Sequence, residues 1–221
     1  MRIAIMQPYF FPYLGYYRLL SLVDLFIVYD CVQFPRRGWV HRNKLSDCNG
    51  NLKWLTLPLK KDARDVKISD LKFQANPEKI LKSQINSFPI LFNGLDKNTS
   101  LNQILFSLEL DPVEYLVRQL DYINQLFNFR TKIIRSSTIS IPDYLKGPDR
   151  ILRIIEHYDS NYYLNSPGGI TIYNKDFFLT RGVELKFLKP YSGSYISILE
   201  RLINEPLDDL KTEINNNVNL L

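Results

Sequence analysis

The chain is short of the residues on which disulfide and metal chemistry depend. It has only two cysteines, Cys31 and Cys48, and two histidines, His41 and His157, among 221 residues. The cysteines show no CxxC spacing, so neither a disulfide framework nor a zinc site has enough ligands. We therefore expect both cysteines to be reduced and the protein to bind no metal.

Long apolar runs are also missing. No segment approaches the roughly 20 apolar residues that span a bilayer. The chain starts directly with a strand-like run instead of a signal peptide. We expect no membrane span and a soluble, cytoplasmic protein.

A strong charge imbalance is absent as well. The 28 lysines and arginines exceed the 23 acidic residues, which gives a net charge of +5, and the basic residues are spread along the chain with acidic residues among them. No basic helix or known nucleic-acid motif is present, so we expect no DNA partner. The sequence also has no Walker loop, no GxGxxG motif and no Ser–His–Asp arrangement. A nucleotide-linked or phosphorylated small substrate explains the modest excess of positive charge, and so does solubility alone.

The residues that are present favour one α/β domain over residues 1–221. Hydrophobic residues make up 45% and charged residues 23%, and this length suits a single core. The strand-like runs Arg2–Met6 and Leu25–Tyr29 flank a segment with helical spacing, Gly15–Val23, which predicts a βαβ unit.

Further elements follow along the chain. A hairpin is expected in Gly38–Lys60, because Trp39–His41 and Leu52–Leu57 flank the turn signal Asp47–Gly50. Asp111 is the expected N-cap of a helix that extends to Phe127. The remaining predictions are helices over Pro77–Ser87, Leu101–Leu108 and Asp149–His157 with Asp149 as an N-cap, strands over Thr131–Ile134, Tyr162–Leu164 and Leu185–Leu188, and a frayed tail around Asn215–Asn217. The expected fold class is α/β, with a Rossmann-like (HUP-like) parallel-sheet core, helices on both faces and an added β-hairpin.

The first two loops that follow strands stand out. In open parallel sheets ligands bind beyond the carboxyl ends of the strands. The loop Gln7–Tyr17 is rich in aromatic residues and prolines, and the loop Asp30–Asn43 adds three arginines, a histidine and two amides. Aromatic faces stack on a base or sugar, and arginine binds phosphate or carboxylate. The two loops together indicate a nucleotide-sugar pocket; the alternative is that the aromatics fill the core and the arginines form a solvated rim.

Several residues have an expected role in this pocket. His41 is the expected general base, with a solvent-facing strand residue as the alternative. Asp30 is the carboxylate expected to hold an amine or a ribose hydroxyl, with a loop cap as the alternative. The glycines of the Ser166–Gly169 turn would bring backbone N–H groups close to an anion. The substrate-binding candidates are Gln7, Tyr9, Tyr13, Gly15, Tyr16, Gln33, Arg36, Arg37, Trp39, Arg42, Asn43, Ser166, Gly168 and Gly169.

The same segments carry a family resemblance. The run Met6–Tyr16 (MQPYFFPYLGY), then Val23–Asp30 (VDLFIVYD), Val32-Gln33-Phe34, Arg37-Gly38-Trp39 and Arg42-Asn43, resembles the opening of the WbqC-like family. The later blocks Trp54–Pro58, Tyr163-Leu164 and Ser166–Gly169 are similar to that family too, whereas Ser192–Glu205 departs from its pattern.

This resemblance implies a role in bacterial surface-polysaccharide biosynthesis, including the O-antigen of lipopolysaccharide. It implies a transferase that moves an acyl or aminoacyl group, such as glycyl, onto the amine of a nucleotide-linked amino sugar. The donor would be an acyl-carrier protein, an acyl-CoA or an aminoacyl-tRNA, and no cofactor is expected.

Two other functions stay open. One is a non-catalytic scaffold that binds sugar nucleotides. The other is an ATP-dependent amide ligase, because the first strand, loop and helix are similar to the start of pantothenate synthetases. Tyr13 and Tyr16 stand where those enzymes carry the histidines that stabilise ATP phosphates, and tyrosine cannot supply that positive charge.

Overall fold

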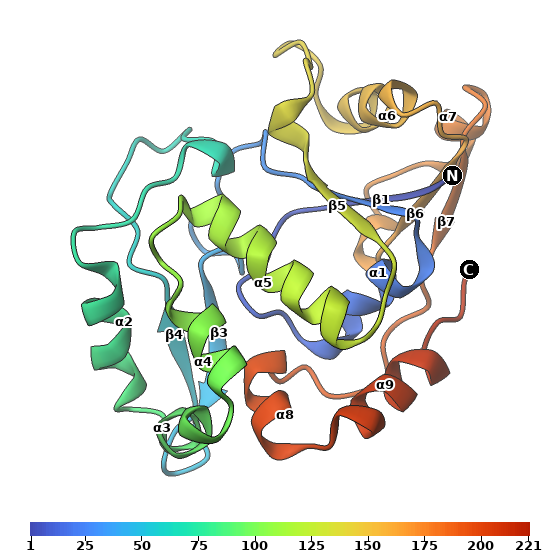
Figure 1. Ribbon diagram of the computed structural model, residues 1–221. Coiled ribbons are helices and arrows are strands. Elements are labelled where there is room, and N and C mark those ends of the chain that lie inside the picture. Colours follow the sequence, from blue (N-terminus) through green and yellow to red (C-terminus); the bar gives the residue numbers. More distant parts are fainter.

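A computed structural model describes residues 1–221, and its centre is a five-stranded parallel sheet (Figure 1). The strands are β1 (Arg2–Met6), β2 (Leu25–Val28), β5 (Lys132–Arg135), β6 (Tyr162–Asn165) and β7 (Glu184–Phe187). Their order is β5-β2-β1-β6-β7, and Ile3 of β1 pairs with Leu25 on one side and Tyr163 on the other. The chain thus moves outward from β1 through β2 to β5 and then crosses back to β6 and β7. This order confirms the predicted Rossmann-like parallel core.

Helices cover both faces of the sheet, as predicted. Successive side chains of a strand point to opposite faces, so Ile3 and Ala4 enter different cores. Ile3 packs in the smaller core with residues of α6 (Gly147–His157) and α7 (Lys175–Leu179). Ala4 packs in the larger core, which includes residues of α1 (Arg18–Leu22) and α5 (Pro112–Leu126).

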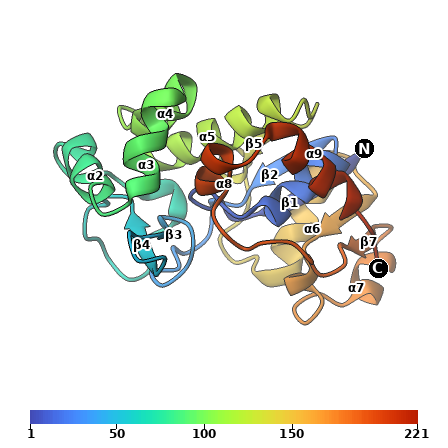
Figure 2. The same cartoon turned by 90° about the horizontal axis from the view of Figure 1, so that it is seen from below.

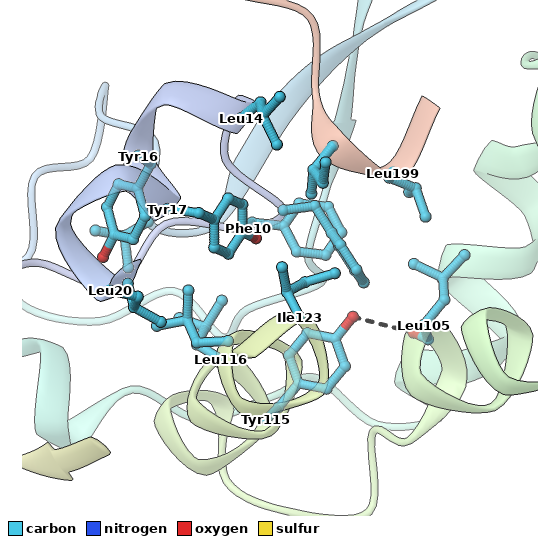
Figure 3. Close-up of a cluster of buried hydrophobic side chains, with 14 of the residues drawn as sticks. Phe10, Leu14, Tyr16, Tyr17, Leu20, Leu105, Tyr115, Leu116, Ile123 and Leu199 are labelled. Atoms are coloured by element: carbon cyan, nitrogen blue, oxygen red, sulfur yellow. Dashed lines mark hydrogen bonds between the residues drawn. The ribbon is translucent and has the colours of Figure 1, made fainter. Parts of the chain in front are cut away.

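The helix α5 begins where the sequence predicts. The Asp111 side chain accepts hydrogen bonds from the backbone N–H groups of Val113 and Glu114, both at 2.9 Å, and Pro112 takes the first helical position. Farther along α5, Tyr115 lies near Phe10 and donates a hydrogen bond to the carbonyl of Leu105 (Figure 3). Helix α5 therefore connects the loop after β1 to α4 (Thr99–Phe106).

A long insertion between β2 and β5 lies beside the sheet (Figures 1 and 2). It contains β3 (Arg42–Ser46), β4 (Leu52–Thr56), α2 (Pro77–Ile85), α3 (Pro89–Gly94) and α4. Strands β3 and β4 form the predicted antiparallel hairpin. In its turn the Asp47 carboxylate accepts from the N–H groups of Asn49 and Asn51, and Gly50 adopts a φ of 76°.

Some local predictions are wrong. Trp39–His41 is not a strand: the N–H of Gly38 donates to the Pro35 carbonyl at 2.7 Å, so the chain turns there and β3 begins only at Arg42. Asp149 is not an N-cap, because α6 already begins at Gly147, and Lys146 takes the capping position.

The C-terminal segment contradicts the prediction of a frayed tail. Two helices, α8 (Ile198–Asn204) and α9 (Leu207–Asn216), close the chain, and α9 includes Asn215 and Asn216. Beyond α9, the Leu221 N–H donates to the Phe187 carbonyl at 2.8 Å, which holds the tail against β7. Helices α3, α7 and α8 were not predicted, because each is too short for a clear periodic pattern.

Short 3-10 turns join several elements: Leu14–Tyr17, Ile68–Asp70, Leu95–Lys97, Ser136–Thr138 and Pro167–Gly169. No helix combines the length and the apolar character needed to cross a membrane.

Candidate functional site

A cavity of about 280 Å³ opens where the strand order reverses, between the carboxyl ends of β1 and β6. We call it the tyrosine cavity. Six predicted substrate-binding residues line it: Tyr9, Tyr13, Gly15, Tyr16, Ser166 and Gly168. The structure therefore brings together the loop after β1 and the turn after β6, because these strands are neighbours and point the same way.

The loop after β1 is held rigidly by buried polar side chains. Gln119 of α5 accepts from the Phe11 N–H and donates to the Tyr9 carbonyl. Asn43 donates to the carbonyls of Phe10 and Phe11, and Ser197 also donates to Phe11. Phe11 has a φ of 41°, an unfavourable conformation for a side chain of this size that surrounding bonds must maintain. The amide of Asn43, a predicted substrate contact, is thus engaged in positioning this loop.

Five tyrosines form the aromatic lining: Tyr9, Tyr13, Tyr16, Tyr191 and Tyr195. Tyr9 and Tyr16 lie 5.4 Å apart between ring centroids, and Tyr13 lies 5.5 Å from Tyr191 and 4.7 Å from Tyr195. Tyr16 donates its hydroxyl hydrogen to the Gln7 carbonyl, whereas the hydroxyls of Tyr9 and Tyr13 contact no protein acceptor. Burial raises the pKa of both Tyr9 and Tyr13, so their hydroxyls stay protonated and able to donate at neutral pH.

Gly15 is required by close packing. A Cβ atom there would lie 2.4 Å from the Tyr13 ring and 2.6 Å from the Tyr191 ring. Both rings therefore reach the backbone only because residue 15 has no side chain. Gly169 shows the same kind of packing against Asn165; it is buried at the end of the turn and does not line the cavity.

Part of the cavity wall comes from the C-terminal third, where the sequence indicated no site. Tyr191 and Tyr195 follow β7, and the Tyr191 hydroxyl donates to Glu213 of α9. Glu213 is also paired with Arg201 of α8 at 2.7 Å. The local sequence signal was the pair of tyrosines, Tyr191 and Tyr195.

Arg18 is the one basic residue that lines the tyrosine cavity, and it was not among the predicted site residues. Its exposed fraction is 1%. Its Nε donates to the Gly15 carbonyl, and its Nη1 donates to the carbonyls of Lys189 and Asn217. Desolvation lowers the pKa of Arg18, and the neighbouring tyrosines offset this only in part.

Asp30 lies elsewhere, at the carboxyl end of β2, and is completely buried. Its carboxylate accepts from Arg135 Nε, from both the N–H and the hydroxyl of Ser137, and from the hydroxyl of Ser136. These four bonds occupy the accepting positions of the carboxylate. Arg135 and Ser137 line a separate groove of about 560 Å³. Asp30 accepts hydrogen bonds from both residues and so fixes their positions in the groove wall.

His41 lies in neither of these spaces. It packs edge-on against Phe34, with ring centroids 4.9 Å apart, and its Nδ1 is buried without a hydrogen-bond partner. Burial, with a smaller contribution from Arg42, lowers the pKa of His41 to about 4. His41 makes no hydrogen bond to Asp30, so the structure does not join the two predicted catalytic residues, and their catalytic roles stay predictions.

The other predicted contacts from the loop after β2 lie in the insertion. Arg42 lies over the Trp54 ring at 4.2 Å, and the half-exposed Trp39 packs on the same ring. Arg36 donates to the carbonyls of Asp62 and Ala63, and Gln33 donates to the Arg64 carbonyl. Arg37 is exposed, and none of these residues lines the tyrosine cavity. No three His, Cys, Asp or Glu side chains are grouped as a metal site would require.

Comparisons with known proteins give one family. The model of the WbqC-like protein family matches residues 7–203, which include the loops after β1, β6 and β7. A stretch of 63 residues is 38% identical to the uncharacterized protein Rv1507c of Mycobacterium tuberculosis. That stretch covers 28% of this chain and only 27% of the relative. No solved structure matches the chain.

Proposed function

Because this chain belongs to the WbqC-like protein family, we propose that it is a sugar-modifying transferase of bacterial surface-polysaccharide biosynthesis. In this proposal the tyrosine cavity holds a nucleotide-linked amino sugar, and an acyl or aminoacyl group is transferred to the sugar amine. The observation that carries the proposal is a rigid, tyrosine-lined cavity at the position where open parallel sheets bind nucleotides.

The lining suits such a ligand. Tyrosine rings offer flat faces for a base or a sugar ring at low cost in conformational entropy. The free hydroxyls of Tyr9, Tyr13 and Ser166 can hydrogen-bond to sugar hydroxyls or to a carbonyl oxygen. The cavity is therefore mostly apolar with a few polar groups, as small-molecule sites usually are.

The proposed reaction needs an activated acyl donor. The sugar amine attacks the acyl carbonyl, the new C–N bond forms, and the bond to the leaving thiolate or alkoxide breaks. One amine proton ends on that leaving group. The protonated hydroxyls of Tyr9 and Tyr13 would donate hydrogen bonds to the oxyanion that forms on the carbonyl.

A non-catalytic sugar-nucleotide scaffold is the second candidate. It is favoured by one observation: no histidine, aspartate or glutamate lines the tyrosine cavity. Such a protein would bind the sugar nucleotide with the same residues but would transfer nothing to it.

The first experiment measures binding by thermal shift. Nucleotide-linked amino sugars, plain sugar nucleotides, ATP and coenzyme A are added separately to the protein. A ligand at 100 times its dissociation constant stabilises by about 2.7 kcal/mol, which corresponds to roughly 5 to 10 °C for a chain of this size. We expect a selective shift with an amino-sugar nucleotide; a shift with ATP alone, or with nothing, contradicts the proposal.

Variants locate the binding site. Tyr13→Ala removes a central ring of the cavity and should abolish most of the ligand-induced shift. Tyr144→Ala is the matched control, because Tyr144 is 80% exposed and lies outside the cavity. Mass spectrometry of the sugar nucleotide after incubation with acyl-CoA, acyl-carrier protein or aminoacyl-tRNA then separates transferase from scaffold: an added acyl mass supports transfer, and binding without it supports the scaffold.

A further inference from the structure

The Arg18 guanidinium is buried with an incomplete set of partners. It has five N–H donors, and three of them are used by the carbonyls of Gly15, Lys189 and Asn217. The two N–H groups of Nη2 contact no protein acceptor. Since Arg18 lines the tyrosine cavity, this unused end of the guanidinium is the part left for a ligand.

No carboxylate neutralises this charge. Arg18 forms no ion pair within 4.0 Å, and burial raises the pKa of its neighbours Tyr13 and Tyr191, so their hydroxyls carry no negative charge at neutral pH. A buried cation without an anionic partner is costly, and buried charges in proteins are otherwise paired.

A second arginine, Arg150, distributes its hydrogen bonds differently. It is also buried, with 8% exposure, and also binds three backbone carbonyls. However, its Nε, Nη1 and Nη2 each have an acceptor, whereas Nη2 of Arg18 has none. Arg150 also lines a groove and also has two unused N–H groups, but these lie on different nitrogens. In Arg18 both unused N–H groups belong to Nη2, so they can bind one ligand together.

We infer that Arg18 is the anion-binding residue of the tyrosine cavity and takes a phosphate-type oxyanion of the bound substrate. A phosphate oxygen would accept from Nη2, and the unpaired Ser166 hydroxyl, which lines the same cavity, is a second donor. The base or sugar would then lie against the rings of Tyr9 and Tyr13. This inference rests on the proposed function for the identity of the whole ligand, but the anion site itself can be tested separately.

The experiment is isothermal titration calorimetry with inorganic pyrophosphate, uridine diphosphate and malonate. Wild-type protein should bind pyrophosphate and uridine diphosphate, with the nucleotide tighter because it adds ring stacking. Arg18→Met should weaken pyrophosphate binding by about 10-fold to 100-fold, the usual effect of losing a charge-assisted hydrogen bond. Arg153→Met is the control and should bind pyrophosphate like the wild type, because Arg153 of α6 lines neither the tyrosine cavity nor the groove that contains Arg135.

A measurement on the wild type covers the case in which Arg18→Met fails to fold. The Nη signals of Arg18 in a ¹H–¹⁵N spectrum should shift when pyrophosphate is added. In a separate variant, Ser166→Ala should reduce the affinity for pyrophosphate several-fold. Unchanged Arg18 signals, or equal affinity in a folded Arg18→Met variant, would overturn the inference. Binding of malonate but not of pyrophosphate would overturn the assignment to phosphate.

The outcomes also separate this inference from the proposed function. If pyrophosphate binds in an Arg18-dependent way but no amino-sugar nucleotide binds, the anion site stands and the proposed function fails. If an amino-sugar nucleotide binds equally well to wild type and Arg18→Met, the proposed function stands and the anion site fails.

Discussion

Asp30 and Arg18 are both buried charged residues, but their surroundings differ. The Asp30 carboxylate accepts four hydrogen bonds and is paired with Arg135 at 2.9 Å. Arg18 binds three neutral carbonyls and packs against the Tyr191 ring, and the two N–H groups of its Nη2 are unused. The charge of Asp30 is thus balanced within the fold, whereas that of Arg18 is not. A carboxylate with no free accepting position is better suited to fixing the ends of β2 and β5 than to holding a substrate.

His41 should stay neutral in the folded protein at all pH values well above 4. Its pKa is lowered to about 4 from an ordinary value of 6.5, so the unfolded chain binds the proton more tightly between these values. Stability is therefore fully present above pH 6.5 and is lost as the pH falls toward 4. The expected loss is about 1 to 3 kcal/mol, reduced by the partial solvent access of the ring.

NMR titration of the imidazole signals measures this pKa directly. Urea unfolding between pH 4 and 7 measures the linked stability, and His41→Gln should flatten that dependence. An imidazole midpoint near 6.5 in the folded protein would show that burial does not control this group.

Gly15→Ala should destabilise the protein and close part of the tyrosine cavity. The added Cβ would lie 2.4 Å from the Tyr13 ring and 2.6 Å from the Tyr191 ring, and both rings are tightly packed. Overpacking of this kind costs about 1 to 3 kcal/mol. Gly168→Ala is the control, because its Cβ would meet nothing closer than 3.9 Å. Thermal melts of the two variants should differ; equal melting temperatures would mean that the rings move aside freely.

At the scale of elements, the cavity depends on segments far apart in the chain. The loop after β1 supplies Tyr9 and Tyr13, and α5 holds that loop through Gln119. Helix α9 holds the opposite wall, because Glu213 accepts from Tyr191 and Asn217 accepts from Arg18. No residue of α9 lines the cavity, but this helix and its C-cap residue bind Tyr191 and Arg18, which do.

Glu213→Gln should destabilise the protein by weakening the contacts of α9 with Tyr191 and Arg201. Glu213 pairs with Arg201, whose side chain is 7% exposed, so removing the carboxylate leaves a mostly buried cation with one partner fewer. We expect a loss of about 1 to 3 kcal/mol in urea unfolding at neutral pH. Glu205→Gln is the matched control on the same arginine and should cost less, because Glu205 is more exposed and does not contact Tyr191.

The same pair predicts a dependence on pH. The hydrogen bond from Arg201 lowers the pKa of Glu213 despite its partial burial. Its contribution is present above the ordinary glutamate range and is lost as the pH falls below it. Glu213→Gln should therefore lose less stability on acidification than the wild type; an equal acid sensitivity in both proteins would contradict this assignment.

At the scale of the whole molecule, one continuous core joins the sheet to the insertion. The larger hydrophobic core contains Phe26 and Leu164 of the sheet as well as Leu45, Leu81 and Leu105 of the insertion. Because these side chains share one core, neither part keeps its packing when the other unfolds.

We therefore predict a single cooperative unfolding transition, which tests the expectation of one domain over residues 1–221. Trp39 precedes β3 and Trp54 lies in β4, so tryptophan fluorescence reports on the insertion, whereas far-ultraviolet circular dichroism reports on all helices and strands. The two signals should change at the same urea concentration. A fluorescence midpoint at lower urea than the dichroism midpoint would identify the insertion as a separate unit.

The sequence alone determined the elements whose signals are local. Three such elements could be predicted: the apolar strands β1 and β2, the start of α5 at Asp111 and Pro112, and the Asn-Gly turn after β3. Strand periodicity, helix capping and turn chemistry each depend on only a few neighbouring residues. The resemblance of Met6–Tyr16 and Ser166–Gly169 also marked both sides of the later cavity.

Only the tertiary structure decided which of these segments meet and which other residues complete the site. The sheet order places β6 beside β1, and no local signal encodes that choice because sheet pairing depends on contacts across more than 150 residues. Arg18 and Tyr191 are brought together by such contacts, at 5.0 Å from the guanidinium carbon to the ring centroid. Whether a buried charge has a partner depends on its three-dimensional surroundings. The sequence therefore did not identify Arg18 as a site residue, and only the folded structure did.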